Sequence, residues 1–228
     1  MTVQDILNCV KVYGPSPARL KGTTTYRARP PPSPITESDL ERMNLVQDID
    51  LSADIVFVGP MAFLGTVCKD IRYLMLTHLR NKSKSELLRG IKSHLAKYSA
   101  HGFKVHRIFC DGESGVVALI DELQSVQALQ LHTAGSETHL GPIENAFRML
   151  KMIARIIYHS VPFAIPSKLY PYLLQFAATR MNMLPSKTLG SDITPREMLT
   201  GKQISAKREL CATFGDRVIM HGSSSNRI

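Results

Sequence analysis

The stretch DIVFVGPMAFLGTV (Asp54–Val67) contains the pattern that decides the fold. In Asp54–Val58, β-branched and aromatic residues follow one another up to a Gly-Pro pair, which predicts a short strand buried on both faces. Phe63–Cys68 and Tyr73–His78 have the same character, with turn-like residues between them. The stretch and its continuation therefore predict three consecutive strands in a meander.

Beyond this meander the pattern alternates between helix and strand. Ser83 and Glu86 form a capping-box pattern at the start of a run with helical spacing. The expected helices are Ser83–Ala100, Ser114–Leu123, Pro142–Ser160, Ser167–Leu184 and a short helix from Thr194, and the expected strands are Lys104–Cys110 and Ala128–His132. This order predicts an α/β fold with a mixed five-stranded sheet flanked by helices.

The pattern also divides the chain into three parts. Residues 1–50 are expected to form an extended, partly disordered lead-in, because Arg27–Pro34 contains four prolines in eight residues. A short helix over Thr36–Val46 is a weaker expectation within it. Residues 51–202 are expected to form one domain, and residues 203–228 a truncated C-terminal segment.

Composition narrows the class of protein. The 228 residues carry a formal net charge of +9 and are 44% hydrophobic, which excludes global disorder. No apolar run reaches the roughly 20 residues that cross a bilayer, so no membrane association is expected. Four scattered cysteines fit a reducing compartment, the nucleus or cytoplasm. The positive charge favours nucleic acid as a partner, although many basic intracellular proteins bind nothing in particular.

Two carboxylates stand beside expected strands. Asp54 opens the first strand, and Asp111 directly follows the strand Lys104–Cys110. A carboxylate beside a buried strand costs free energy unless a metal, a hydrogen bond or a cation satisfies it. Alternatively, Asp111 belongs to an ordinary Asp-Gly turn, and Asp54 only terminates a strand. Asp48 and Asp50 are rivals of Asp54, but neither leads directly into a strand-like run.

The expected helix Pro142–Ser160 adds a third carboxylate and a line of cations. Four charged residues recur at helical spacing and share one narrow stripe of this helix: Glu144, Arg148, Lys151 and Arg155. A carboxylate followed by three cations suits a metal site beside a row of phosphates. An exposed face with a Glu144–Arg148 salt bridge is the alternative.

Together these segments resemble the catalytic core of retroelement integrases, in particular that of copia-type LTR retrotransposons. The resemblance covers residues 52–202 and is carried by Asp54–Val67, Val105–Gly115 (VHRIFCDGESG), Gly141–Lys151 (GPIENAFRMLK) and Ile193–Gly201 (ITPREMLTG). It implies a ribonuclease H-like fold. The zinc module that precedes the core in this family is not expected here, since residues 1–50 contain no histidine and only Cys9.

The resemblance also implies roles for the candidate residues. Asp54, Asp111 and Glu144 match the catalytic triad and would hold two Mg²⁺ or Mn²⁺ ions. Arg148 and Lys151 match positions that face the DNA end, and Arg155 extends their line by geometry alone.

The function implied is metal-dependent DNA cleavage and strand transfer by a homo-oligomer, with DNA as partner and no small-molecule organic cofactor. Two alternatives stay open. One is an inactive retrotransposon remnant that only binds nucleic acid, and the other is a ribonuclease H-like nuclease with a different substrate.

Overall fold

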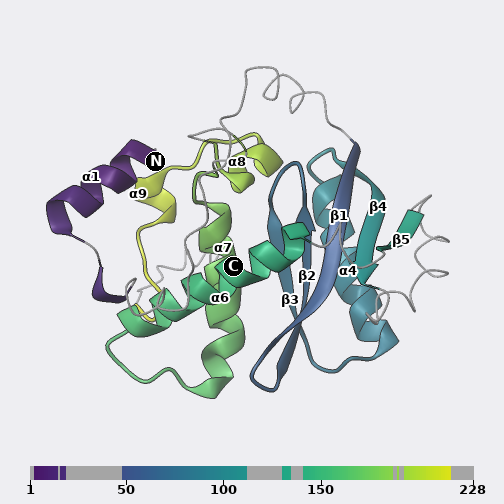
Figure 1. Cartoon of the computed structure of the whole chain (residues 1–228), viewed down its shortest axis with the longest axis horizontal. Coiled ribbons are helices and arrows are strands. Elements are labelled where there is room, and N and C mark those ends of the chain that lie inside the picture. The colour runs from purple at the N-terminus through teal and green to yellow at the C-terminus, as the bar shows by residue number, and fades with distance from the viewer. Residues whose placement is uncertain are drawn as a thin grey trace, which may run out of the picture.

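The sheet is the centre of the fold. A computed structural model describes residues 3–14, 16–18, 48–111, 130–134, 141–186, 189 and 193–216 (Figure 1). The strands are β1 (Asp48–Val58), β2 (Met61–Cys68), β3 (Leu74–Leu79), β4 (Lys104–Asp111) and β5 (Gln130–Ala134). Their order is β3-β2-β1-β4-β5; β1, β2 and β3 pair antiparallel, and β4 pairs parallel with both β1 and β5. The mixed sheet expected from the sequence is therefore confirmed.

One strand begins earlier than expected. β1 starts at Asp48 rather than at Asp54, so Asp54 lies within the strand and does not open it. The reason is the alternation in Asp48–Ala53, where Ile49, Leu51 and Ala53 are buried on one face and polar residues occupy the other positions. Asp48 and Asp50 both lie within β1, so the prediction that neither leads directly into a strand was wrong.

The helices are α1 (Val3–Tyr13), α4 (Lys84–Ser99), α6 (Gly141–Ser160), the 3-10 helix η2 (Ser167–Leu169), α7 (Tyr170–Asn182), α8 (Pro195–Thr200) and α9 (Ala206–Glu209). Four helices, α4, α6, α7 and α8, lie where the sequence predicts helices, whereas α1 and α9 were not expected. None of the helices in the described ranges is long and apolar enough to cross a membrane. The expected helices Thr36–Val46 and Ser114–Leu123 lie outside the described residues.

Two expectations about helices need correction. The lead-in is not extended throughout, because Val3–Tyr13 forms α1. The single helix expected over Ser167–Leu184 is divided into η2 and α7, with Pro171 in the first turn of α7. Proline lacks the N–H that a continuous helix needs at this position but suits a helix start.

Helices cover both faces of the sheet. Figure 1 shows α6 crossing the near face and α4 lying behind the strands. On the α4 side the core is built from Leu87, Ile91, Leu95 and Tyr98 against β1, β2, β3 and β4. On the other side Phe147, Leu150 and Ala154 of α6 and Leu174 and Ala177 of α7 pack on Val56, Phe63, Val67 and Leu74. The site expected on α6 therefore lies on the side of the sheet that α6 and α7 cover.

α7 holds the edge of the sheet through one buried amide. The Asn182 Nδ2 donates to the carbonyl of Leu74 (2.8 Å), and its Oδ1 accepts from the N–H of Leu74 (2.9 Å). The side chain thus pairs with the first residue of β3 in the way that a neighbouring strand would. This pairing fixes α7, and with it the packing of α6, against the sheet.

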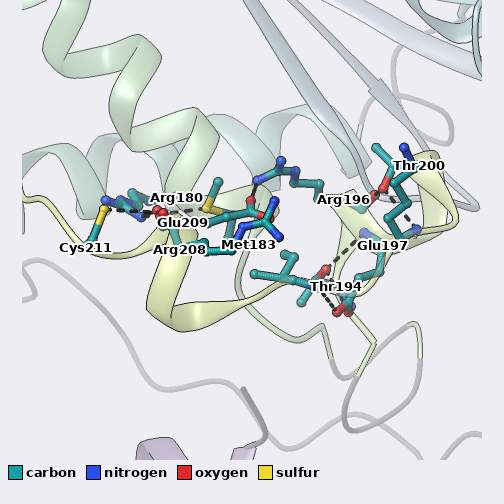
Figure 2. Close-up of polar contacts among 11 residues, drawn as sticks. Arg180, Met183, Thr194, Arg196, Glu197, Thr200, Arg208, Glu209 and Cys211 are labelled. Atoms are coloured by element: carbon teal, nitrogen blue, oxygen red, sulfur yellow. Dashed lines mark hydrogen bonds and ion pairs between the residues drawn. The ribbon is translucent and has the colours of Figure 1, made fainter. Parts of the chain in front are cut away.

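Polar contacts stabilise the segment that follows α7 and hold part of it against this helix (Figure 2). Arg180 on α7 donates to the carbonyls of Glu209 and Ala212. Thr194 and Glu197 form the capping box of α8, as the Thr-Pro-Arg-Glu pattern indicates, and Glu197 also accepts from the N–H of Ile204. Arg180 thereby holds the segment from Glu209 to Ala212 beside α7.

His94 belongs to α4, and its side chain is buried between this helix and the strands β2 and β3. Its ring nitrogens are 2.9 Å from the hydroxyls of Thr66 on β2 and Thr77 on β3. Burial, with a smaller contribution from Lys97, lowers the pKa of His94 from 6.5 to about 4. The ring is therefore neutral in the folded protein at neutral pH.

This buried histidine predicts a loss of stability in acid. Between pH 6.5 and 4 the unfolded chain binds a proton that the folded chain does not, so the free energy of unfolding falls as the pH is lowered. We expect a loss of about 2 kcal/mol between pH 7 and pH 5 from this group, at about 1.4 kcal/mol per pKa unit. Urea denaturation at the two pH values measures it. His94→Gln should reduce the loss, whereas the exposed control His101→Gln should not; equal losses in all three proteins would contradict the assignment.

Candidate active site

Asp54 lies in the middle of β1, at the centre of the sheet. By strand alternation its side chain is on the same face as Val56, which packs against α6. The carboxylate is half-buried, and its Oδ1 accepts from the N–H of Ile55 (2.7 Å). The carboxylate thus offers an oxygen ligand for a metal on the face of the sheet that α6 covers.

A bulge in the β1–β4 pairing brings Asp54 level with Asp111. Before the bulge Ile49 pairs with Val105; after it Asp50 pairs with Arg107, and the shifted register continues to Ala53 and Cys110. Asp54 and Asp111 each follow one member of that last pair, so they occupy neighbouring positions on adjacent parallel strands. Without the bulge, Asp54 would lie level with Cys110 instead. The described residues include the backbone of Asp111 at the end of β4 but not its side chain.

A glycine on the other side of Asp54 lets α6 approach the sheet. Gly65 on β2 pairs with Asp54, and a Cβ added there would lie 2.3 Å from Cε1 of Phe147 on α6. Phe147 therefore occupies the space over the backbone next to Asp54. Glu144 is one helical turn before Phe147, so the close approach brings the turn that carries Glu144 to this part of the sheet. A glycine inside a strand pattern is the sequence signal of such a close approach, and the prediction from the sequence did not include it.

The charged stripe of α6 is exposed along its length. Glu144, Arg148, Lys151 and Arg155 are all solvent-accessible, as a functional stripe and a solvated face both require. The Arg148 guanidinium donates to the Oδ1 of Asn145 (2.5 Å). Among the described residues, no ion pair holds Lys151 or Arg155. Two cations of the stripe are thus available for an external anion.

The rival aspartates are engaged elsewhere. Asp50 accepts two hydrogen bonds from the guanidinium of Arg107 (2.9 and 2.6 Å), and Asp48 lies 3.4 Å from the Nε2 of His106. These four residues line a separate hollow of about 290 Å³ near the start of β1. Asp54 differs from both because it is beside Asp111 and faces α6.

The donor chemistry fits a divalent metal, but a complete ligand set is not visible in the described part of the chain. Carboxylate oxygens are the ligands that Mg²⁺ and Mn²⁺ prefer. Within the described ranges, no group of three or more His, Cys, Asp or Glu side chains is placed to hold a metal ion. The assignment of Asp54, Asp111 and Glu144 as ligands therefore stays a prediction, and so does the DNA-binding role of Arg148, Lys151 and Arg155.

Comparison with solved structures identifies the fold. The catalytic core domain of BIV integrase aligns with a TM-score of 0.53 at 15% identity, over 66% of this chain and 92% of that one. The HTLV-2 integrase catalytic core domain in complex with magnesium, a trimeric form, aligns with a TM-score of 0.53 at 13% identity, over 68% of this chain and 98% of that one. No protein-family model matches the chain, and no curated protein matches it. The chain has the ribonuclease H-like fold of integrase catalytic cores; its resemblance to the copia type stays a prediction.

Proposed function

We propose that this chain is an integrase-like protein that cleaves and joins DNA with divalent metal ions. One observation carries the proposal: the β1–β4 bulge aligns Asp54 with Asp111, at the place where Gly65 admits α6 and its Glu144. Carboxylates from two strands and one helix would thereby converge on one face of the sheet. The integrase-core fold is consistent with this arrangement.

Each residue has a stated part in the proposal. Asp54, Asp111 and Glu144 would hold two Mg²⁺ or Mn²⁺ ions, which activate a water or 3′-hydroxyl and stabilise the leaving oxygen when bound. The backbone N–H of Ile55 fixes the orientation of the Asp54 carboxylate. Lys151 and Arg155 would neutralise phosphates along α6 and so position the scissile bond.

The partner proposed is DNA, and the working form proposed is a homo-oligomer, in the nucleus or the cytoplasm. The net charge of +9 supports an anionic partner. The alternative is an inactive remnant that only binds nucleic acid, and it needs the cations of the α6 stripe but not the three carboxylates.

The test is Mn²⁺-dependent nicking and joining of a branched DNA substrate, with wild type compared with Asp111→Asn. We expect turnover with the wild type, loss of at least about a hundredfold in the variant, and salt-dependent DNA binding in both. Lys104→Gln, at the other end of β4, is the matched control for a change on the same strand.

Two other results would be informative. No turnover by either protein, with DNA binding intact, would overturn the catalytic proposal and leave the remnant. Equal turnover by both proteins would show that Asp111 is not part of the site.

A further inference from the structure

A concave apolar surface lies further along α6 than the candidate active site. The end of β1, the later turns of α6 and the start of α7 enclose a hollow of about 430 Å³, within the 300–1,000 Å³ typical of small-ligand sites. Most of the residues that line it are aromatic or aliphatic: Val58, Tyr158, Tyr170, Leu173 and Leu174. We call it the α6–α7 hollow.

The aromatic rings of this hollow remain in contact with water. Tyr158 is 38% exposed, and Tyr170 is partly exposed. Tyr158 meets Tyr170 edge to face, with ring centroids 6.4 Å apart. Such an arrangement holds the orientation of the rings and leaves apolar surface free for a flat ligand.

The rim of the α6–α7 hollow is cationic. Lys151 and Arg155 lie among the lining residues, and none of the described residues that line it is acidic. A ligand that suits this site is therefore flat and apolar in its centre and carries negative charge at its margin.

A nucleotide has this chemistry, and the position of the hollow suits a strand bound at the candidate active site. Lys151 and Arg155 lie about 10 Å and about 16 Å from Glu144 along the helix axis, at 1.5 Å per residue. At about 3.4 Å per base pair, this corresponds to about three to five base pairs. A paired base presents only its edge in a groove, so only an unpaired base can stack on side chains inside a hollow.

We infer that the α6–α7 hollow receives one unpaired base of the DNA strand that lies along α6. Tyr158 stacks on the base, and Lys151 and Arg155 neutralise the phosphates on either side of it. The inference rests on the proposed function, since it names a feature of the DNA at that site. It predicts a preference for DNA that is unpaired three to five positions from the bond that is cut.

The experiment compares two duplexes of the same sequence, one with a single unpaired 2-aminopurine and one fully paired. Wild type should bind the unpaired form more tightly and quench its fluorescence by stacking. Tyr158→Ala should lose about tenfold of this selectivity, within the range for one aromatic–base stack. The matched control is Tyr172→Ala, because this exposed tyrosine on α7 is not among the lining residues.

The outcomes separate this inference from the proposed function. Nicking by wild type without any selectivity for the unpaired base would overturn the inference alone. Selectivity that depends on Tyr158 in a protein that does not nick DNA would support the base site and overturn the catalytic proposal. A change in self-association with Tyr158→Ala, without a change in selectivity, would show that the α6–α7 hollow is a protein contact and would overturn the inference.

Discussion

Asp54→Asn is expected to lower the rate of Mn²⁺-dependent DNA nicking by at least about a thousandfold. A metal ligand contributes several kcal/mol of charge stabilisation in the transition state, and about 4 kcal/mol corresponds to that factor. The fold should survive, since asparagine keeps the size of the side chain and an oxygen that accepts from the N–H of Ile55. DNA affinity without metal should not fall, because the substitution removes a negative charge.

The matched control for Asp54→Asn is Asp50→Asn on the same strand. Asp50 is bonded to Arg107 at the exposed start of β1, so its loss should cost less than about 1 kcal/mol in stability and leave the rate of nicking nearly unchanged. Nicking rates in single-turnover reactions, with urea denaturation of each protein, measure both effects. Loss of nicking in Asp50→Asn together with retention in Asp54→Asn would assign the first carboxylate to Asp50 instead.

Gly65→Ala is the second substitution with a large expected effect, because it separates α6 from the sheet. The new Cβ would lie 2.3 Å from Cε1 of Phe147, a ring that is itself buried in the core. Overpacking of this kind costs about 1–3 kcal/mol. The helix turn that bears Glu144 would move away from Asp54, and a displacement near 1 Å is enough for about a hundredfold loss in nicking.

Two further variants test the cause of that loss. Phe147→Leu removes the ring atoms that a Cβ at position 65 would meet, so the double variant should lose less stability than the two single variants together. Gly90→Ala is the matched control: its Cβ would lie 2.7 Å from a terminal methyl of Leu64 and 3.8 Å from Cγ2 of Thr77, and alanine favours the helix by about 1 kcal/mol. A loss in Gly90→Ala as large as that in Gly65→Ala would show that the effect is not specific to α6.

The sequence predicted the parts of the fold whose patterns are local. The apolar runs in β2 and β3 and the capping box that begins α8 depend only on neighbouring residues, and the structure contains them at the expected places. At the start of α4 only half of the expected capping box forms: the Ser83 hydroxyl accepts from the N–H of Glu86, but the N–H of Ser83 donates to Asn81 instead of Glu86. β1 was predicted too short because Asp48, Asp50 and Asp54 interrupt its apolar character. Their alternation with buried residues is nevertheless a strand signal of period two.

The geometry of the candidate site depends on contacts between distant segments, which spacing alone does not specify. The pairing of Asp54 with Gly65 and the bulge that aligns Asp54 with Asp111 are properties of strand register. Register is set by the packing of whole faces and not by any one residue. The choice of Asp54, Asp111 and Glu144 came from their types and order, whereas the reason why α6 lies close to the sheet came only from the packing of Phe147 on Gly65.

The amide of Asn182 also has a consequence for the stage of synthesis at which the edge strand β3 is protected from pairing with other chains. Asn182 and Leu74 are 108 residues apart in sequence, so the start of β3 is an open strand edge until α7 has been synthesised and docked. Open edges are templates for pairing with other chains, and contacts of such long range form slowly. A nascent or truncated chain that ends before α7 therefore leaves the backbone of Leu74 unpaired at this edge, which adds an aggregation hazard at the start of β3.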